Sequence, residues 1–88
     1  MKLNENFALR QVAGNWVVIP LAEKSLDLSG ILSLNDSGAM LWKVLENGGD
    51  RDALIAALTA EYNIDQATAG ADVDEFIHKL TRMGCMEG

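Results

Sequence analysis

The first third of the chain alternates apolar and polar positions, and the rest changes to a helical spacing. Residues 7–12 and 16–21 are rich in β-branched and aromatic side chains, as is typical of strands. Between them, residues 13–15 include a glycine and an asparagine, which tolerate a positive φ and favour a tight turn. The pattern predicts a hairpin in which Pro20, having no N–H to donate, lies near the end of the second strand.

A third strand is predicted over residues 28–34, after a polar connection at 22–27. Every second residue of this segment, beginning with Leu28 and ending with Leu34, is leucine or glycine. This period of two is expected of a strand that buries one face. The three strands together predict an antiparallel sheet.

Two helices are predicted to follow the sheet. The polar residues at 35–37 can accept hydrogen bonds from the free N–H groups of a helix start, and apolar residues follow at helical spacing until Asn-Gly-Gly at 47–49. Asp50 is the expected N-cap of the second helix, which has one apolar face and is expected to end at Asn63.

A third helix is expected to begin near Asp65 and to end before Gly84, which is placed to take the left-handed conformation. Gly70 within it costs about 1 kcal/mol relative to alanine, which indicates either close packing or a later start at Thr68. The fold class is therefore α+β, with a three-stranded antiparallel sheet followed by a three-helix bundle. Residues 1–88 are expected to form a single domain.

Composition narrows the possible partners. The chain has 88 residues, 49% of them hydrophobic and 23% charged, with a net charge of −6, as in ordinary globular domains. Its seven basic residues are scattered from Lys2 to Arg82, whereas phosphate binding needs clustered basic groups. The longest apolar run, at 16–22, is short of the roughly 20 residues that span a membrane, and no signal-peptide core follows Lys2. We therefore expect a cytoplasmic protein that binds neither nucleic acid nor membrane.

The residues that could carry catalysis are few. Cys85 is the only cysteine and His78 the only histidine, so neither has an obvious partner for a disulfide, a metal or a proton transfer. Cys85 is interpreted as a small apolar residue, with a reactive thiol as the alternative, and His78 as a helix-surface residue. Asp72, Asp74 and Glu75 are expected to point to different sides of their helix and to form a solvated face. No enzymatic activity, metal or cofactor is expected.

Three groups of residues, in their order and spacing, resemble the PqqD-like family, small proteins related to the pyrroloquinoline quinone biosynthesis chaperone. The resemblance covers nearly the whole chain. The groups are residues 34–39 ahead of 41–42, residues 58–62 with 64–65, and Asp72, Val73, Phe76, Ile77, Leu80 and Gly84.

This resemblance implies a winged-helix-like domain that recognises the leader segment of a ribosomally made precursor peptide. It also implies a partner enzyme that modifies the peptide, often a radical S-adenosylmethionine enzyme. Members of the family bind the leader as an added strand on the third strand, in a groove against the third helix. An unpaired sheet edge is independently expected to be either protected or used for docking.

The site residues follow from that implied binding mode. The third strand would pair with the peptide backbone through Leu28, Ser29, Gly30, Ile31, Leu32 and Ser33. The third helix would form the other wall through apolar Val73, Phe76, Ile77 and Leu80, with Asp72, Glu75 and Lys79 on the neighbouring polar side. The competing interpretation is a core stripe beside a surface pair of Glu75 and Lys79. An exposed strand edge also permits a homodimer that would compete with the peptide.

Two other functions are compatible with parts of the sequence. Asp36-Ser37 superficially fits the phosphopantetheine attachment site of an acyl carrier protein, but Gly38 stands where such proteins have Leu or Met, and the strand-rich start conflicts with an all-helical carrier. A winged-helix DNA-binding regulator fits the expected fold but lacks a basic patch.

Overall fold

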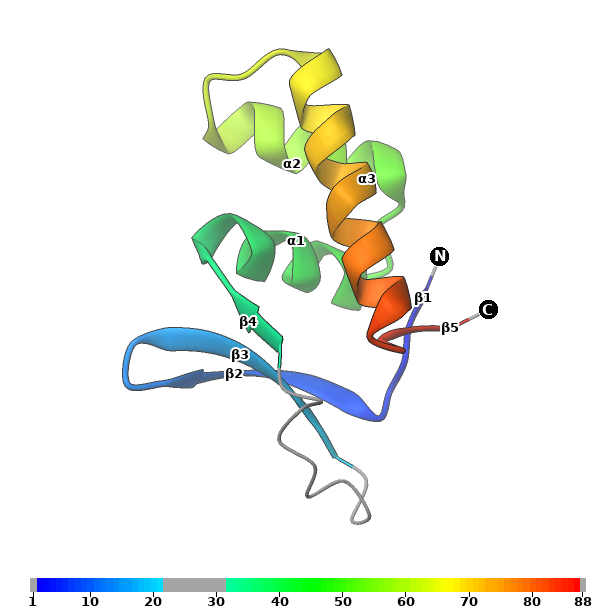
Figure 1. Cartoon of the computed structure of the whole chain (residues 1–88). Helices are drawn as coiled ribbons and strands as arrows, with labels where there is room; N and C mark the ends of the chain where they lie inside the picture. Colours follow the sequence, from blue (N-terminus) through cyan, green and yellow to red (C-terminus); the bar gives the residue numbers. More distant parts are fainter. Residues whose placement is uncertain (1, 22–31, 88) are drawn as a thin grey trace.

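The computed structural model describes residues 2–21 and 32–87, which form five strands and three helices (Figure 1). The strands are β1 (Lys2–Leu3), β2 (Phe7–Val12), β3 (Asn15–Pro20), β4 (Leu32–Leu34) and β5 (Met86–Glu87). The helices are α1 (Asp36–Glu46), α2 (Arg51–Glu61) and α3 (Gln66–Arg82). The expected site residues Leu28, Ser29, Gly30 and Ile31 lie outside the described residues, as does the connection at 22–27.

The predicted hairpin is confirmed. β2 and β3 are antiparallel, and their pairing runs from Phe7 opposite Pro20 to Val12 opposite Asn15. The two turn residues, Ala13 and Gly14, have φ values of 52° and 83°. Asn15, which was expected to belong to the turn, is instead the first residue of β3. Two consecutive positive φ angles suit the right-handed twist of a hairpin with a two-residue loop.

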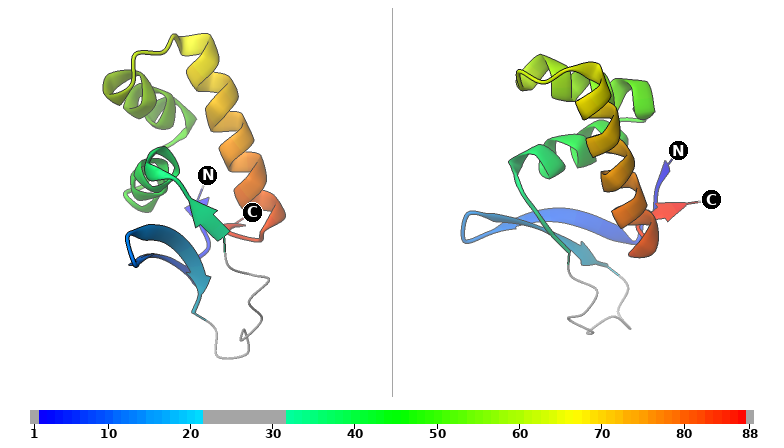
Figure 2. Two further views of the ribbon diagram at one scale, coloured as in Figure 1. Left: turned by 60° about the vertical axis from the view of Figure 1, so that its left-hand side comes forward. Right: turned by 45° about the horizontal axis from the view of Figure 1, so that its top comes forward.

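β4 pairs antiparallel with β3 and completes a sheet in the order β2-β3-β4. Leu32 lies opposite Val18 and Leu34 opposite Trp16, so these four side chains share one face of the sheet. Val18 is fully buried there. Both views of Figure 2 show the three helices on one side of this sheet, which is where the core forms.

The predicted N-cap Asp50 and the expected helix starts at residues 35–37 and near Asp65 are confirmed. A side-chain oxygen of Asn35, Asp50 and Asp65 accepts a hydrogen bond from the backbone N–H three residues later, at 2.8, 2.9 and 2.7 Å respectively. The end of α2 was predicted too late, because the backbone is already extended at Tyr62.

Gly70 is buried where α2 packs against α3. A Cβ atom added to it would lie 3.3 Å from Arg51 Nη2 and 3.8 Å from Ile55 Cδ1, so the glycine allows close approach of the two helices. The close-packing interpretation is therefore confirmed, and the alternative start at Thr68 is wrong because α3 begins at Gln66.

The core lies between the helices and the sheet, and its largest fully buried side chains include Trp42, Leu54 and Leu80. The sequence analysis missed a second small sheet, in which Lys2 lies opposite Glu87 and Leu3 opposite Met86. Two-residue strands are too short to display an alternating pattern, which explains the omission. In the described part of the chain no helix is both long and apolar enough to cross a membrane.

Candidate functional site

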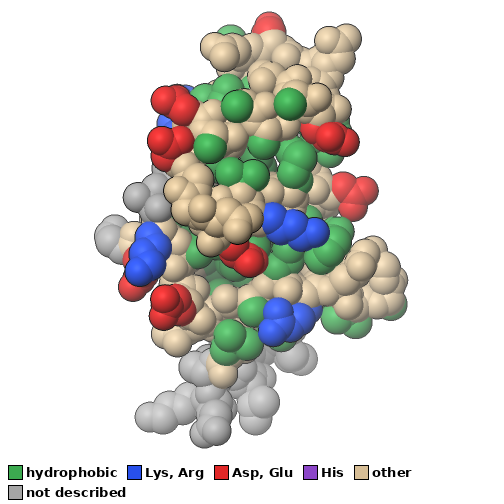
Figure 3. Space-filling model, turned by 180° about the vertical axis from the view of Figure 1, so that it is seen from behind, with side chains coloured by type: hydrophobic (Ala, Val, Ile, Leu, Met, Phe, Trp, Pro, Cys, Tyr) green, Lys and Arg blue, Asp and Glu red, His purple; other side chains and the backbone are tan. Residues whose placement is uncertain are grey.

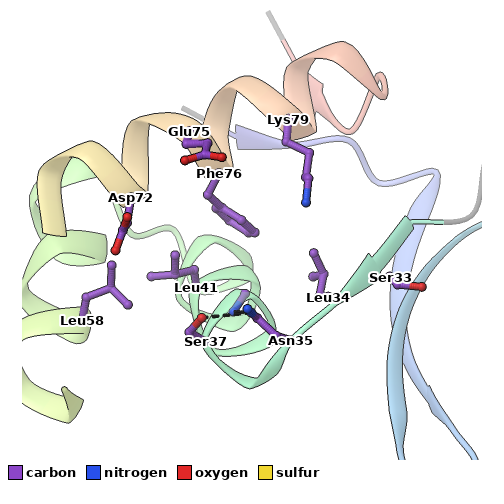
Figure 4. Close-up of a pocket in the computed structure, with 11 residues that line it drawn as sticks. Ser33, Leu34, Asn35, Ser37, Leu41, Leu58, Asp72, Glu75, Phe76 and Lys79 are labelled. Carbon is purple, nitrogen blue, oxygen red and sulfur yellow. Dashed lines mark hydrogen bonds between the residues drawn. The ribbon is translucent and has the colours of Figure 1, made fainter. Parts of the chain in front are cut away.

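A groove with a volume of about 400 Å³ lies between β4, the start of α1 and α3 (Figure 4). Leu41 and Leu58 are buried residues of α1 and α2 that reach its lining. The complete lining consists of Ser33, Leu34, Asn35, Ser37, Gly38, Leu41, Leu58, Asp72, Glu75, Phe76 and Lys79.

One face of α3 forms a wall of the groove. Asp72, Glu75, Phe76 and Lys79 follow one another at intervals that place them on the same side of a helix. Phe76 is 9% exposed and also belongs to the hydrophobic core, so its ring joins the groove to the protein interior. Its ring points across the groove toward Leu34 of β4, as Figure 4 shows.

The start of α1 forms the rim next to β4. Asn35 Oδ1 accepts hydrogen bonds from Gly38 N at 2.8 Å and from Ser37 Oγ at 2.9 Å. A Cβ atom at Gly38 would lie 3.2 Å from that oxygen and 3.3 Å from Leu34 Cβ. Glycine thus lets the end of β4 turn closely into the helix and leaves the groove open at this corner.

The free edge of β4 lies beside this groove. Among the described residues, β4 pairs with β3 on one side only. An edge strand directs alternate N–H and C=O groups away from the sheet, where they can pair with another extended chain. The site therefore combines backbone hydrogen-bonding capacity with an adjacent, partly apolar cavity.

The sequence model of the family described as Coenzyme PQQ synthesis protein D (PqqD) matches residues 16–85. The chain belongs to the PqqD family. The match begins in β3 and ends beyond α3, so it includes every element of the groove.

Solved structures support the PqqD-like fold. The structure of TbiB1 in complex with the TbiA(beta) leader peptide is similar, with 24% identity, a TM-score of 0.82, and coverage of 100% of this chain and 96% of that one. Lasso peptide synthetase B1 complexed with the leader peptide has 20% identity, a TM-score of 0.79, and coverage of 99% and 96%. No curated protein matches the chain. The predicted α+β class, with three antiparallel strands ahead of three helices, is confirmed.

The expected site residues that the structure describes in this PqqD-family protein separate into two groups. Ser33, Asp72, Glu75, Phe76 and Lys79 line the groove, although Figure 4 shows the Ser33 side chain turned away from it.

The other expected residues that the structure describes lie against the core. Leu32 and Ile77 are half-buried and pack on it, while Val73 and Leu80 are both 0% exposed. Val73 and Leu80 belong to the face of α3 that covers the protein interior, so a bound peptide could not reach them without unfolding. Both are therefore removed from the candidate contacts.

The sequence analysis missed six residues of the lining, which are Leu34, Asn35, Ser37, Gly38, Leu41 and Leu58. The sequence did contain a signal for Leu34, Asn35, Ser37 and Gly38. They form the end of the predicted edge strand and the helix start that directly follows it, so they must lie beside the end of that strand edge. No such local signal places Leu58, which reaches the groove only through the packing of α2 against the other helices.

As expected, Asp72, Asp74 and Glu75 are all exposed and point to different sides of α3. Asp72 and Glu75 line the groove, whereas Asp74 is bound to Arg51 of α2. Arg51 Nε donates to Asp74 Oδ1 at 2.7 Å and Arg51 Nη2 donates to Asp74 Oδ2 at 3.1 Å. The hydrogen bond from Arg51 lowers the pKa of Asp74.

This ion pair predicts a pH-dependent contribution to stability. Because folding lowers the pKa of Asp74 below its ordinary value of 3.8, the pair stabilises the fold above that value and is lost as the pH falls through the folded pKa. Asp74→Asn is expected to lower Tm at pH 6 and to lower it less at about pH 2. Thermal unfolding monitored by circular dichroism at both values measures this. Asp72→Asn serves as the matched control, and equal Tm losses for Asp74→Asn at the two pH values would contradict the assignment.

Cys85 and His78, the two residues considered for catalysis, lie in ordinary structural positions. Cys85 is 1% exposed, and burial raises the pKa of its thiol, so the thiol remains protonated near neutral pH. His78 is exposed on α3. Within the described ranges, no group of three His, Cys, Asp or Glu side chains is placed to hold a metal ion.

Several basic side chains are already engaged with other groups. Lys2 approaches Glu87 at 3.7 Å, Arg51 binds Asp74, and Lys43 Nζ lies 4.4 Å from the centre of the Trp16 ring. On the face shown in Figure 3, Lys and Arg side chains are spaced apart among acidic and apolar ones. This distribution does not favour a nucleic-acid interface.

The acyl-carrier alternative is contradicted by the fold, since a sheet occupies the position where an all-helical carrier would have helices. Ser37 is also half-buried and its hydroxyl is held by the Asn35 cap.

Proposed function

We propose that this PqqD-family protein is a non-catalytic module that binds the leader of a ribosomally made precursor peptide. The leader adds to the free edge of β4 and places side chains in the groove closed by α3. The single observation that supports this most strongly is the adjacency of an unpaired strand edge and a partly apolar groove. The two similar structures, which are complexes with leader peptides, agree with this proposal.

The expected affinity follows from the type of contact. Main-chain hydrogen bonds provide a gain in binding free energy that does not depend on the peptide sequence, and the few apolar anchors provide selectivity. Ordering a flexible leader offsets this gain by several kcal/mol. A dissociation constant in the micromolar to submicromolar range, roughly 8 to 9 kcal/mol of binding free energy, is therefore expected.

The bound leader would be presented to a modifying enzyme of the radical S-adenosylmethionine type, in the cytoplasm where the precursor is synthesised. The same free edge could instead pair with a second copy of the chain. Such a homodimer would cover the groove, so peptide binding and dimerisation would compete.

Peptide binding can be tested without knowledge of the natural precursor. Random twelve-residue peptides displayed on their own messenger RNA would be selected on the immobilised chain, and the most enriched peptide would be labelled and titrated by fluorescence anisotropy. Ser37→Trp places a large side chain at the groove lining without removing a core residue, and it should weaken binding by about ten-fold or more. Glu61→Ala, at an exposed position of α2, should leave the affinity unchanged. Failure to enrich any peptide, or equal binding by Ser37→Trp, would overturn the proposal.

A further inference from the structure

The charges of α3 are distributed unequally along the groove. Figure 4 shows Asp72 at the end near Leu58 of α2 and Lys79 at the end near Leu34 of β4. The carboxylate of Glu75 lies between them, and the Phe76 ring projects into the groove beside it. Because the Glu75 carboxylate lies on the Asp72 side of the Phe76 ring, the site has an acidic part at Asp72 and Glu75, an apolar middle at Phe76 and a basic end at Lys79.

These three charged groups are available to a ligand. Within residues 2–21 and 32–87, the ion pairs are Lys2 with Glu87 and Arg51 with Asp74, and neither includes a charged residue of the groove. Glu75 and Lys79 are four residues apart, yet they form no salt bridge in this part of the chain, so the surface-pair interpretation is not supported. Asp74 is turned toward Arg51 and leaves Asp72 and Glu75 as the acidic groups of the groove.

The separation of Asp72 and Lys79 along α3 determines how far apart the complementary side chains of a bound peptide must lie. Asp72 and Lys79 are seven residues apart on a helix, which corresponds to about 10.5 Å along its axis. Same-side positions of an extended peptide repeat every 6.6 to 6.8 Å or so, so three successive ones span about 13 Å. Long charged side chains accommodate the small difference. Three inward-facing positions, i, i+2 and i+4, therefore match the acidic end, the apolar middle and the basic end.

The sheet also sets the direction of the peptide. All its strands are antiparallel, and an added strand that continues this arrangement runs opposite to β4. β4 runs from Ser33 toward Asn35, and Figure 4 shows that the opposite direction leads from the Asp72 end toward the Lys79 end. A basic side chain would thus come first in the peptide and an acidic one last.

We infer that the groove selects a leader segment with a basic residue at i, an apolar residue at i+2 and an acidic residue at i+4. This inference rests on the proposed function and adds a ligand class to it. Asp72 and Glu75 bind the basic side chain, Phe76 and Leu34 contact the apolar one, and Lys79 binds the acidic one. Each solvent-exposed ion pair is expected to contribute about a three-fold gain in affinity, and the two together roughly ten-fold.

A charge exchange tests the inference. The double variant Asp72→Lys/Lys79→Glu keeps the net charge and reverses the polarity of the groove. Peptide selection from the same random library, on the variant and on the unmodified chain, is expected to give opposite consensus patterns, with acidic residues at i and basic residues at i+4 for the variant. The control exchange Arg10→Glu/Glu46→Lys lies outside the groove lining and should retain the original pattern.

The possible outcomes separate this inference from the proposed function. The inference would be overturned, with leader binding left intact, if the selected peptides bind Ser37→Trp more weakly but carry no charge pattern. It would also be overturned if the unmodified chain and the exchanged variant select the same charge pattern. Absence of any enriched peptide that depends on the groove would overturn both.

Discussion

Phe76→Ala is expected to weaken binding of a selected peptide by about thirty-fold or more. Phe76 lines the groove and is 9% exposed, so its ring would be fully desolvated when a peptide covers it. Aromatic anchors near the centre of an interface commonly cost 2 kcal/mol or more of binding free energy when truncated, which corresponds to that ratio. Fluorescence anisotropy titration of the labelled peptide measures the change.

The matched control for Phe76→Ala is Leu54→Ala. Leu54 is fully buried on α2 and is not part of the groove lining. Both truncations remove core contacts and should lower the free energy of unfolding by roughly 2 to 5 kcal/mol. Titrations at a temperature where circular dichroism shows both variants folded should find weakened binding for Phe76→Ala alone. Equal losses in the two variants would indicate a general loss of structure instead of a lost contact.

Trp42→Ala is expected to lower the free energy of unfolding by about 3 to 5 kcal/mol, whereas Trp42→Phe should change it by less than about 1 kcal/mol. Trp42 is 1% exposed in the core, so its truncation leaves a large cavity. Its Nε1 has no hydrogen-bond partner in the described part of the protein. Phenylalanine removes this unsatisfied donor, and that gain offsets much of the packing lost with the smaller ring.

Urea unfolding followed by circular dichroism would measure both Trp42 variants. A loss for Trp42→Phe as large as that for Trp42→Ala would contradict the account, because it would mean that Nε1 makes a stabilising interaction. Leu45→Ala, a truncation in the same helix, provides a reference for an ordinary buried side chain.

The features predicted correctly depend on short-range chemistry. Gly14 adopts the positive φ expected of it in the hairpin turn, and Asn35, Asp50 and Asp65 cap helices as their residue types allow. Such elements are set by groups within about four residues of one another. For this reason their positions could be read from the sequence with errors of only one or two residues at the helix ends.

The features that were missed depend on long-range packing. Leu58 reaches the groove because α2 packs against α3. β1 pairs with β5, although the two strands lie at opposite ends of the sequence. An apolar stripe on a helix shows that one face is covered, but it does not show whether the protein core or a groove lies against that face. The stripe of α3 therefore could not reveal that Val73 and Leu80 face the core while Phe76 also borders the groove.

The central claim, that a leader peptide adds as a strand to β4, is tested most directly by amide-resolved hydrogen exchange. NMR spectra of the chain with and without the selected peptide would report the exchange rates of residues Leu32–Leu34 and Phe7–Val12. We predict that the amides of β4 that point away from β3 exchange about ten-fold more slowly with peptide bound, while those of β2 are unchanged. Slower exchange only along the free edge of β2, or no change in β4, would contradict strand addition.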